Sequence, residues 1–321
     1  MRRRGPNGFA RWVGLFTAVF LAGCQADLPA PPPETAVYHW ETQLRLPDSL
    51  LRARQVHRLY IKVFDVSYAD GRPTPSALLE TDRAGLPVEG VPVVFLTNEV
   101  FAHPHAGLAA DVLRLLERRF PFPYAELQID CDWTAATRAA YFAFLGELGR
   151  LSGKALSCTV RLHQYRDRGT QGVPPVDRAV LMAYNTGDLD RWETENSIFD
   201  SAIVDAYLNG QSPYPLPLDL AVAAYDWAVV YRRGTLAYLV NEPDLEALAD
   251  TARFARLSPT RYRLDSSTYY GGLYLYRNDL LRLEKATAAE ARRLGRDGWP
   301  RVANAGSRYL IYYHIGSRQW E

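Results

Sequence analysis

Cysteine is scarce in this 321-residue sequence, which has three, at positions 24, 131 and 158, beside six scattered histidines. No Cys/His spacing of the zinc type occurs, so we expect no metal site, and no cofactor is expected either. Cys131 and Cys158 fall in expected neighbouring strands. We expect two buried free thiols there, with a disulfide as the alternative if their Cα atoms approach within about 7 Å.

The sequence also lacks an excess of charge of one sign, because it has 37 Lys and Arg residues and 36 Asp and Glu residues, for a net charge of +1. Four arginines lie in the first 23 residues, which contain no acid, so the rest of the chain carries −3. Nucleic-acid binders concentrate cationic side chains, and we therefore expect no nucleic-acid partner. The hydrophobic fraction of 48% predicts a globular domain with a sizeable core.

No apolar run reaches the length of about 20 residues that spans a bilayer. The apolar residues 12–22 follow an arginine-rich start, which is the geometry of a signal peptide. We therefore expect a signal peptide over residues 1–23, a proline-rich tether over 24–35 and one folded domain over 36–321.

Residues 21–24, Leu-Ala-Gly-Cys, resemble the bacterial lipobox. The resemblance implies removal of residues 1–23, lipidation of Cys24 with a palmitate-type chain, and a protein held in the cell envelope by a lipid anchor. Gln25 stands where an inner-membrane retention signal has Asp, which favours the outer membrane. An ordinary secretory signal with a coincidental cysteine is the alternative.

Short β-rich runs alternate with helical periodicity along the remaining chain. Eight strands are expected at residues 37–44, 58–65, 91–97, 126–132, 155–163, 178–185, 218–225 and 309–315. Helices are expected at residues 108–119, 134–151, 197–208 and 244–257. Eight strand–helix units with right-handed crossovers predict an α/β fold, a (β/α)8 TIM-type barrel. An open doubly wound sheet is the alternative, but no Gly-rich phosphate loop follows the first strand.

Two late segments fit the barrel badly. Residues 227–240, with Arg233 and Gly234 at their middle, are predicted to form an appended hairpin. Residues 269–277 are predicted to form an extra strand, followed by a helix over 279–294. We therefore expect an insertion near barrel strands 7 and 8.

Alternation along the fourth strand places Gln128, Asp130 and Asp132 on the barrel interior. The fifth strand places Arg161 and His163 on the same face. An unpaired buried carboxylate is costly, so Arg161 is the expected partner of Asp130 or Asp132, and we predict an ion pair between Asp130 and Arg161.

Two motifs on these strands resemble those of family 18 chitinases. Residues 127–134, Leu-Gln-Ile-Asp-Cys-Asp-Trp-Thr, resemble the fourth-strand signature Asp-x-Asp-x-Glu, and residues 181–185, Leu-Met-Ala-Tyr-Asn, resemble the sixth-strand Met-x-Tyr-Asp. Residues 38–40, 59–65 and 217–227 are similar to an uncharacterised group of Gram-negative envelope lipoproteins with a glycosidase-like barrel. The resemblance implies a glycoside-hydrolase-like barrel whose partner is a carbohydrate or another envelope component.

The sequence departs from the chitinase pattern at the position of the general acid, which is Thr134 here, and at Asn185, where the pattern has Asp. Thr134 cannot protonate a glycosidic oxygen, so chitinase chemistry is not expected. A glycosidase still needs an acid and a base or nucleophile, about 5–5.5 Å apart for retention and about 6.5–9.5 Å for inversion. Asp132 and Glu99 are the preferred catalytic pair, because they follow adjacent strands. The other carboxylates considered are Asp130 and Asp226, then Glu41 and Asp65.

Aromatic rings and polar groups near strand ends are the expected sugar-binding elements. The binding candidates are Asp130, Trp133, Arg161, His163, Tyr184, Asn185, Asp226 and Trp227. Trp133 and Trp192 have polar neighbours and are expected at the mouth, whereas Trp40 and Trp227 could equally pack in the core. Three hypotheses stay open at this point: an envelope glycoside hydrolase, a non-catalytic glycan binder, and a scaffold without a small-molecule site.

Overall fold

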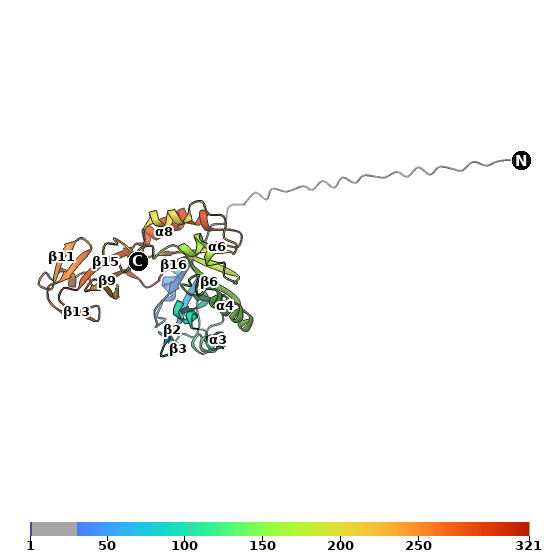
Figure 1. Cartoon of the computed structure of the whole chain (residues 1–321), viewed down its shortest axis with the longest axis horizontal. Helices are drawn as coiled ribbons and strands as arrows, with labels where there is room; N and C mark the ends of the chain where they lie inside the picture. The colour runs from blue at the N-terminus through green and yellow to red at the C-terminus, as the bar shows by residue number, and fades with distance from the viewer. Residues whose placement is uncertain (2–30, 104, 321) are drawn as a thin grey trace.

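The computed structural model describes residues 1, 31–103 and 105–320, and the expected lipidation site Cys24 lies outside them. Its centre is a closed barrel of eight parallel strands (Figure 1). The strands are β1 (Glu34–His39), β2 (Val56–Ala69), β4 (Glu89–Leu96), β5 (Glu126–Asp130), β6 (Ala155–Arg161), β7 (Arg178–Met182), β8 (Leu218–Ala223) and β16 (Tyr309–Tyr313). The barrel closes because β1 pairs with both β2 and β16. The predicted TIM-type fold is confirmed.

Helices cover the outside of the barrel (Figure 1). They are α1 (Asp48–Ala53), α2 (Asn98–Ala102), α3 (Leu108–Arg119), α4 (Arg138–Ser152), α5 (Leu162–Arg166), α6 (Arg168–Gln171), α7 (Ser201–Leu208) and α8 (Ala288–Val302). The predicted bounds of α3 are confirmed. Helix α7 begins later than expected because Asp200 caps it, accepting hydrogen bonds from the backbone of Ala202 and Ile203. No helix in the described ranges is long and apolar enough to cross a membrane.

An antiparallel insertion lobe follows β8 and lies to one side of the barrel (Figure 1). Its strands are β9 (Tyr225–Arg232), β10 (Thr235–Asn241), β11 (Phe254–Ser258), β12 (Arg261–Leu264), β13 (Thr268–Tyr270), β14 (Leu273–Leu275) and β15 (Leu280–Ala286). Five of them form one sheet in the order β10-β9-β15-β12-β11, and β13 pairs with β14 alone. The remaining elements are β3 (Arg72–Ser76), which pairs with β2, η1 (Ala247–Ala249) and η2 (Arg318–Trp320). The expected insertion and its first hairpin are confirmed.

Three predictions inside this lobe are wrong in detail. Residues 244–257, expected as a helix, contain η1 and β11, because the side chains of Asp244 and Asp250 bind nearby backbone N–H groups and stabilise turns. Residues 269–277, expected as one strand, form the β13–β14 hairpin. Residues 279–294 are strand β15 followed by the start of α8, which begins after a capping box between Thr287 and Glu290.

The amino-terminal end of the barrel interior is closed by buried ion pairs. Arg58 donates to Glu126 at 2.6 Å and to Glu89 at 2.7 Å, and Arg178 lies 3.6 Å from Asp219. Apart from Glu89, the partners are buried or largely so, and each charge has an opposite charge beside it. Cys131 and Cys158 are buried free thiols on the helix-facing side, as predicted.

Candidate functional site

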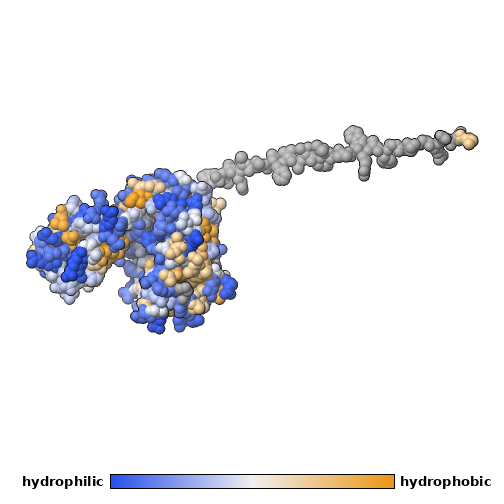
Figure 2. Space-filling view, in the orientation of Figure 1, coloured by the Kyte–Doolittle hydropathy of each residue, from blue (hydrophilic) through white to orange (hydrophobic). Residues whose placement is uncertain are grey.

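The mouth of the barrel holds a pocket of about 270 Å³ where β1, β8 and β16 end. The insertion lobe forms its outer wall, and Figure 2 shows the hollow between lobe and barrel. The lining residues combine aromatic rings with polar side chains, and they are Trp40, Glu41, Asn185, Tyr225, Asp226, Trp227, Asn241, Glu242, Tyr313, His314 and Ser317. Such a lining can contact both an apolar face and a polar edge of one ligand.

Tyr313, at the end of β16, is the centre of the aromatic part of this pocket. Its ring lies 5.3 Å from Trp40, 5.4 Å from Tyr225 and 5.4 Å from Tyr184, on which it stacks. Tyr184 is buried beneath the pocket, where it supports Tyr313. Burial raises the pKa of both phenols well above the ordinary value, so both rings stay neutral.

Trp227 is fixed by a buried carboxylate of the neighbouring strand. Its Nε1 donates to Glu284 Oε2 at 2.7 Å, and the same carboxylate accepts from Arg282 Nε at 2.5 Å and from the Ser197 hydroxyl. Ser197 belongs to the segment after β7, so Glu284 joins the lobe to the barrel. The indole ring is thereby held in one orientation at the pocket wall.

Asn185 and Asp226 also reach the pocket, but their side chains already have partners. Tyr225 donates its hydroxyl to Asn185 Oδ1 at 2.8 Å, and Asn185 adopts a left-handed backbone with φ of 55°. Asp226 accepts from Arg318 Nε at 2.8 Å and from Gln319 Nε2 at 3.2 Å. The structure therefore brings three predicted binding residues, Asn185, Asp226 and Trp227, into one pocket.

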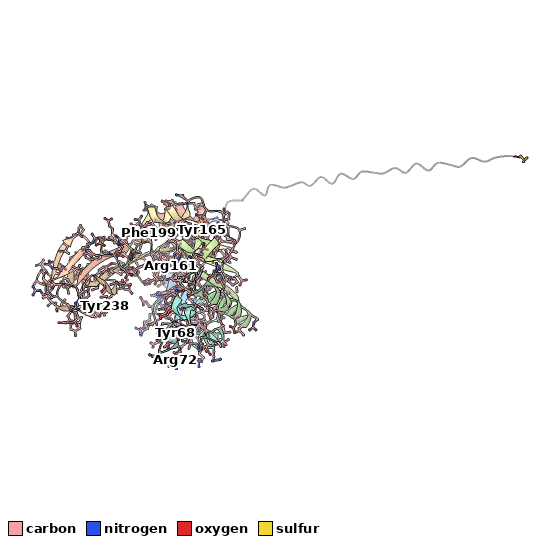
Figure 3. All side chains as sticks on the ribbon, in the orientation of Figure 1. Tyr68, Arg72, Arg161, Tyr165, Phe199 and Tyr238 are labelled. Atoms are coloured by element: carbon pink, nitrogen blue, oxygen red, sulfur yellow. The ribbon has the colours of Figure 1, made fainter. Side chains whose placement is uncertain are left out.

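The predicted ion pair between Asp130 and Arg161 is wrong. Arg161 instead makes a two-pronged ion pair with Asp132, and Asp130 accepts a hydrogen bond from the Thr159 hydroxyl at 2.6 Å. Asp132 and Arg161 share a face of their strands, as the alternation predicted, and Figure 3 labels Arg161 on the barrel part of the molecule.

Strand register explains this change of partner. Gln128 of β5 lies opposite Ser157 of β6, so the alternate positions that follow place Thr159 beside Asp130 and Arg161 at the level of Asp132. Alternation along each strand predicted the face of each residue but not this register.

Asp130 is a buried carboxyl group without a cation in direct contact. Burial first, and the charge of Asp132 second, raise its pKa to about 7, while the hydrogen bond from Thr159 opposes the rise. A group with this pKa is partly protonated at neutral pH. Asp130 could therefore donate a proton where an ordinary aspartate could not.

The preferred catalytic pair does not line the pocket. Glu99 is exposed in the first turn of the short helix α2, because the chain turns into a helix directly after β4. Asp132 is 39% exposed and its carboxylate is bound to Arg161. The pairing of Glu99 with Asp132 stays a prediction that the pocket does not support.

Two further candidates lie away from the pocket. Trp133 was expected at the mouth but is wholly buried, stacked on Tyr141 at 5.2 Å, with its Nε1 donating to the Gln171 carbonyl at 3.1 Å. His163 is exposed on α5, because β6 ends at Arg161 rather than at residue 163.

Thr134 stands at the turn that leads into α4. Its backbone N–H donates to the Thr137 hydroxyl at 3.0 Å, and its carbonyl accepts from the Arg138 N–H. The residue in the position of the chitinase general acid therefore has a structural role in starting the helix.

Sequence reasoning missed several residues of the pocket. Tyr313 could have been found, because it shares the inward face of its strand with Tyr309 and Ile311. Glu242, which lines the pocket, and Glu284, which holds Trp227 from behind it, come from the insertion lobe, whose placement no local pattern reveals. His314 is a further missed residue, and burial lowers its pKa.

The described part of the chain contains no group of three or more His, Cys, Asp or Glu side chains that could hold a metal ion.

No family model and no curated protein matches the sequence. Among solved structures, a chitinase from Chromobacterium violaceum ATCC 12472 is similar with a TM-score of 0.51 and 12% identity, covering 89% of this chain and 96% of that one. A glycoside hydrolase family 18 N-acetylglucosaminidase from Paenibacillus barengoltzii has a TM-score of 0.48 and 15% identity, covering 89% and 96%. The spore cortex-lytic enzyme SleL of Bacillus cereus has a TM-score of 0.47 and 16% identity, covering 88% and 71%. At these identities the likeness is one of fold: the barrel has a distant structural similarity to that of the chitinase.

Proposed function

We propose that the mouth of the barrel binds a carbohydrate. The observation that carries this proposal is the pocket around Tyr313, where Trp40, Tyr225 and Trp227 present rings beside the polar side chains of Asn185 and other residues. Flat apolar rings contact the C–H faces of sugars, and the surrounding polar groups can hydrogen-bond to the sugar hydroxyls. The similarity of fold to glycosidase barrels supports the same ligand class.

Chitinase-type hydrolysis is not part of this proposal, because Thr134 replaces the general acid and is used in a helix turn. A second candidate function, hydrolysis by another route, is favoured by one observation. Asp130, with a pKa raised to about 7 by burial and by the nearby charge of Asp132, could serve as an acid beside an Asp132 carboxylate held by Arg161. Binding is preferred, because Asp130 is buried and lies outside the pocket lining.

We also propose that Cys24 is lipidated and that this lipid anchors the domain to the outer membrane. Pro31 accepts a hydrogen bond from Trp299 Nε1 of α8 at 3.0 Å, and β1 begins at Glu34, at the barrel end opposite the mouth. Seven residue steps separate Cys24 from Pro31, which is at most about 25 Å of extended chain. An anchor attached there would direct the pocket away from the membrane.

The test of binding is a glycan array probed with the full chain in detergent, comparing Trp227→Ala with Trp192→Ala. Both tryptophans are half-buried, but Trp192 packs against Arg261 and Tyr231 outside the pocket. We expect Trp227→Ala alone to lose binding. Equal binding by the two variants, or no glycan bound by the parent chain, would overturn the proposal.

Hydrolysis and anchoring have separate tests. Release of reducing ends from any bound glycan, abolished by Asp130→Asn, would support the second candidate. Incorporation of labelled palmitate that persists in Cys24→Ser would contradict lipidation.

A further inference from the structure

The pocket at the barrel mouth is lined by three carboxylates that come from separate parts of the chain. Glu41 follows β1, Asp226 is the second residue of β9, and Glu242 follows β10. Arg318 balances the charge of Asp226, whose Oδ2 accepts from Arg318 Nε at 2.8 Å. Glu41 and Glu242 are exposed, and neither forms an ion pair with a Lys, Arg or His side chain in the described ranges. The pocket therefore carries two negative charges that no protein cation balances.

Both glutamates lie against the segment that follows β16. Glu242 Oε1 accepts from the Arg318 backbone N–H at 2.9 Å, and Glu41 Oε1 lies 3.7 Å from the position that a Cβ at Gly316 would occupy. His314 lies beside both carboxylates, and burial lowers its pKa although the two glutamates oppose the shift. This histidine is therefore neutral at neutral pH and does not offset their charge.

Asp226 adds an oxygen that lacks a hydrogen-bond donor. The residue lines the pocket and is only 5% exposed, and its Oδ1 has no partner among the side chains and backbone groups that the structure describes. A buried carboxylate oxygen without a donor is costly. A cationic donor on a ligand in the pocket would lower this cost.

The aromatic rings of the pocket also suit a positively charged group. Lys62 Nζ already lies 5.6 Å from the Trp40 ring, and this ammonium is paired with Asp65 at 3.0 Å. The rings of Trp227 and Tyr313 are half-buried, and no cation of the described residues lies over them. Ammonium groups are attracted to the faces of such rings, most strongly to Trp. Carboxylates and aromatic faces thus favour the same kind of ligand group.

We propose that the mouth pocket prefers a sugar with a free ammonium group, which is an amino sugar without an N-acetyl group, to neutral and anionic sugars. The inference rests on the proposed function and names its ligand class. Glu41 and Glu242 would pair with the ammonium, while the aromatic rings contact the sugar face. N-acetylation removes the charge of the amine, and a carboxylate or phosphate on the sugar would be repelled by both glutamates.

The size of the pocket agrees with such a ligand. Its volume of about 270 Å³ is at the lower end of the range of ligand pockets, which is about 300–1,000 Å³. It therefore suits a short segment of a sugar chain, and a test with short oligosaccharides is appropriate.

The experiment compares three trisaccharides that differ only in the substituent at C2, using the full chain in detergent. They are the β-1,4-linked trisaccharides of glucosamine, N-acetylglucosamine and glucose, measured by calorimetry near pH 7, where an amine with an ordinary pKa of about 8 is mostly protonated. The variant is Glu41→Gln combined with Glu242→Gln. Its matched control is Glu117→Gln combined with Glu147→Gln, which removes two exposed charges on α3 and α4, outside the pocket.

We expect the parent chain to bind the glucosamine trisaccharide about tenfold or more tighter than the other two, which corresponds to about 1.4 kcal/mol. The variant at Glu41 and Glu242 should lose this preference, whereas the control should keep it. A parent that binds the N-acetylglucosamine or glucose trisaccharide equally well overturns the inference and leaves glycan binding in place. A preference that persists in the variant at Glu41 and Glu242 also overturns it.

Two further outcomes separate the inference from the proposed function. If the parent binds none of the three trisaccharides, the inference fails, and the proposed function fails for these sugars. Ethanolamine and choline supply an ammonium group without a sugar. If either displaces the glucosamine trisaccharide at an equal concentration, the pocket recognises an ammonium group alone, and the inference of an amino sugar is wrong.

Discussion

The two ends of the barrel interior use polar side chains in opposite ways. At the amino-terminal end, Arg58 binds Glu126 and Glu89, and these charges are almost wholly occupied by one another. At the mouth, Asn185 and Asp226 also have partners, but they border a pocket beside the half-buried rings of Trp40, Trp227 and Tyr313. Buried ion pairs close one end of the barrel, whereas polar groups and aromatic rings at the other end leave room for a ligand.

The largest expected effect is at the closed end. Arg58→Met should lower the free energy of unfolding by about 3–5 kcal/mol, because Glu126 would be left as a buried charge without its partner. Urea unfolding measures this loss. Adding Glu126→Gln should recover part of it, and glycan binding by the folded fraction should not change. A loss below about 1 kcal/mol would mean that this end is not closed by charge pairing.

A smaller effect is expected at Glu284, where the lobe meets the mouth. Glu284→Gln removes the anion that faces the fully buried Arg282 and leaves one oxygen for the donors that two oxygens now accept from, and should cost about 2–4 kcal/mol. Because Trp227 and Arg282 would then compete for that oxygen, ligand binding should weaken as well. Glu193→Gln, at a residue of the segment after β7 that contacts Arg261 only through its backbone, is the control. Unchanged binding in Glu284→Gln would show that Trp227 needs no such anchor.

Asp130 should make stability depend on pH. Its pKa is raised to about 7 in the folded chain by burial and by the charge of Asp132, against about 3.9 in an unfolded chain. Between these values the folded state holds a proton that the unfolded state releases, so the free energy of unfolding falls as pH rises, by on the order of 4 kcal/mol between pH 4 and 8.

Asp130→Asn should remove this contribution while keeping an acceptor for the Thr159 hydroxyl. Chemical unfolding at a series of pH values compares it with the parent and with Asp265→Asn, whose side chain is 41% exposed. A parent and an Asp130→Asn variant with the same pH profile would contradict the raised pKa.

The smallest effect is expected at Arg161 and Asp132. Both side chains are partly exposed, at 25% and 39%, so Arg161→Gln should cost no more than about 1 kcal/mol despite the two-pronged geometry. Thermal unfolding with and without 0.5 M salt measures it. A cost as large as that of Arg58→Met would erase the difference between the two ends of the barrel.

The predictions from the sequence succeeded for the strands and failed where partners come from distant segments. All eight barrel strands were expected within a few residues of their observed positions, because each has a buried β-rich run of its own. The catalytic pair of Asp132 and Glu99 stays a prediction: it was based on the adjacency of two strand ends, and no sequence pattern indicated that Glu99 lies in the first turn of α2. Trp133 was wrongly expected at the mouth, because its polar neighbours in the sequence did not indicate a buried position beside Tyr141.

The sequence by itself determined which side chains face the barrel interior, because a strand alternates its faces whatever its neighbours are. It thereby placed Asp130, Asp132 and Arg161 on one face. Only the tertiary structure decided that Arg161 binds Asp132 rather than Asp130, because strand register is set between strands. Only the tertiary structure placed Trp227 in the same pocket as Tyr313, because Trp227 belongs to an insertion whose position depends on packing across the whole lobe.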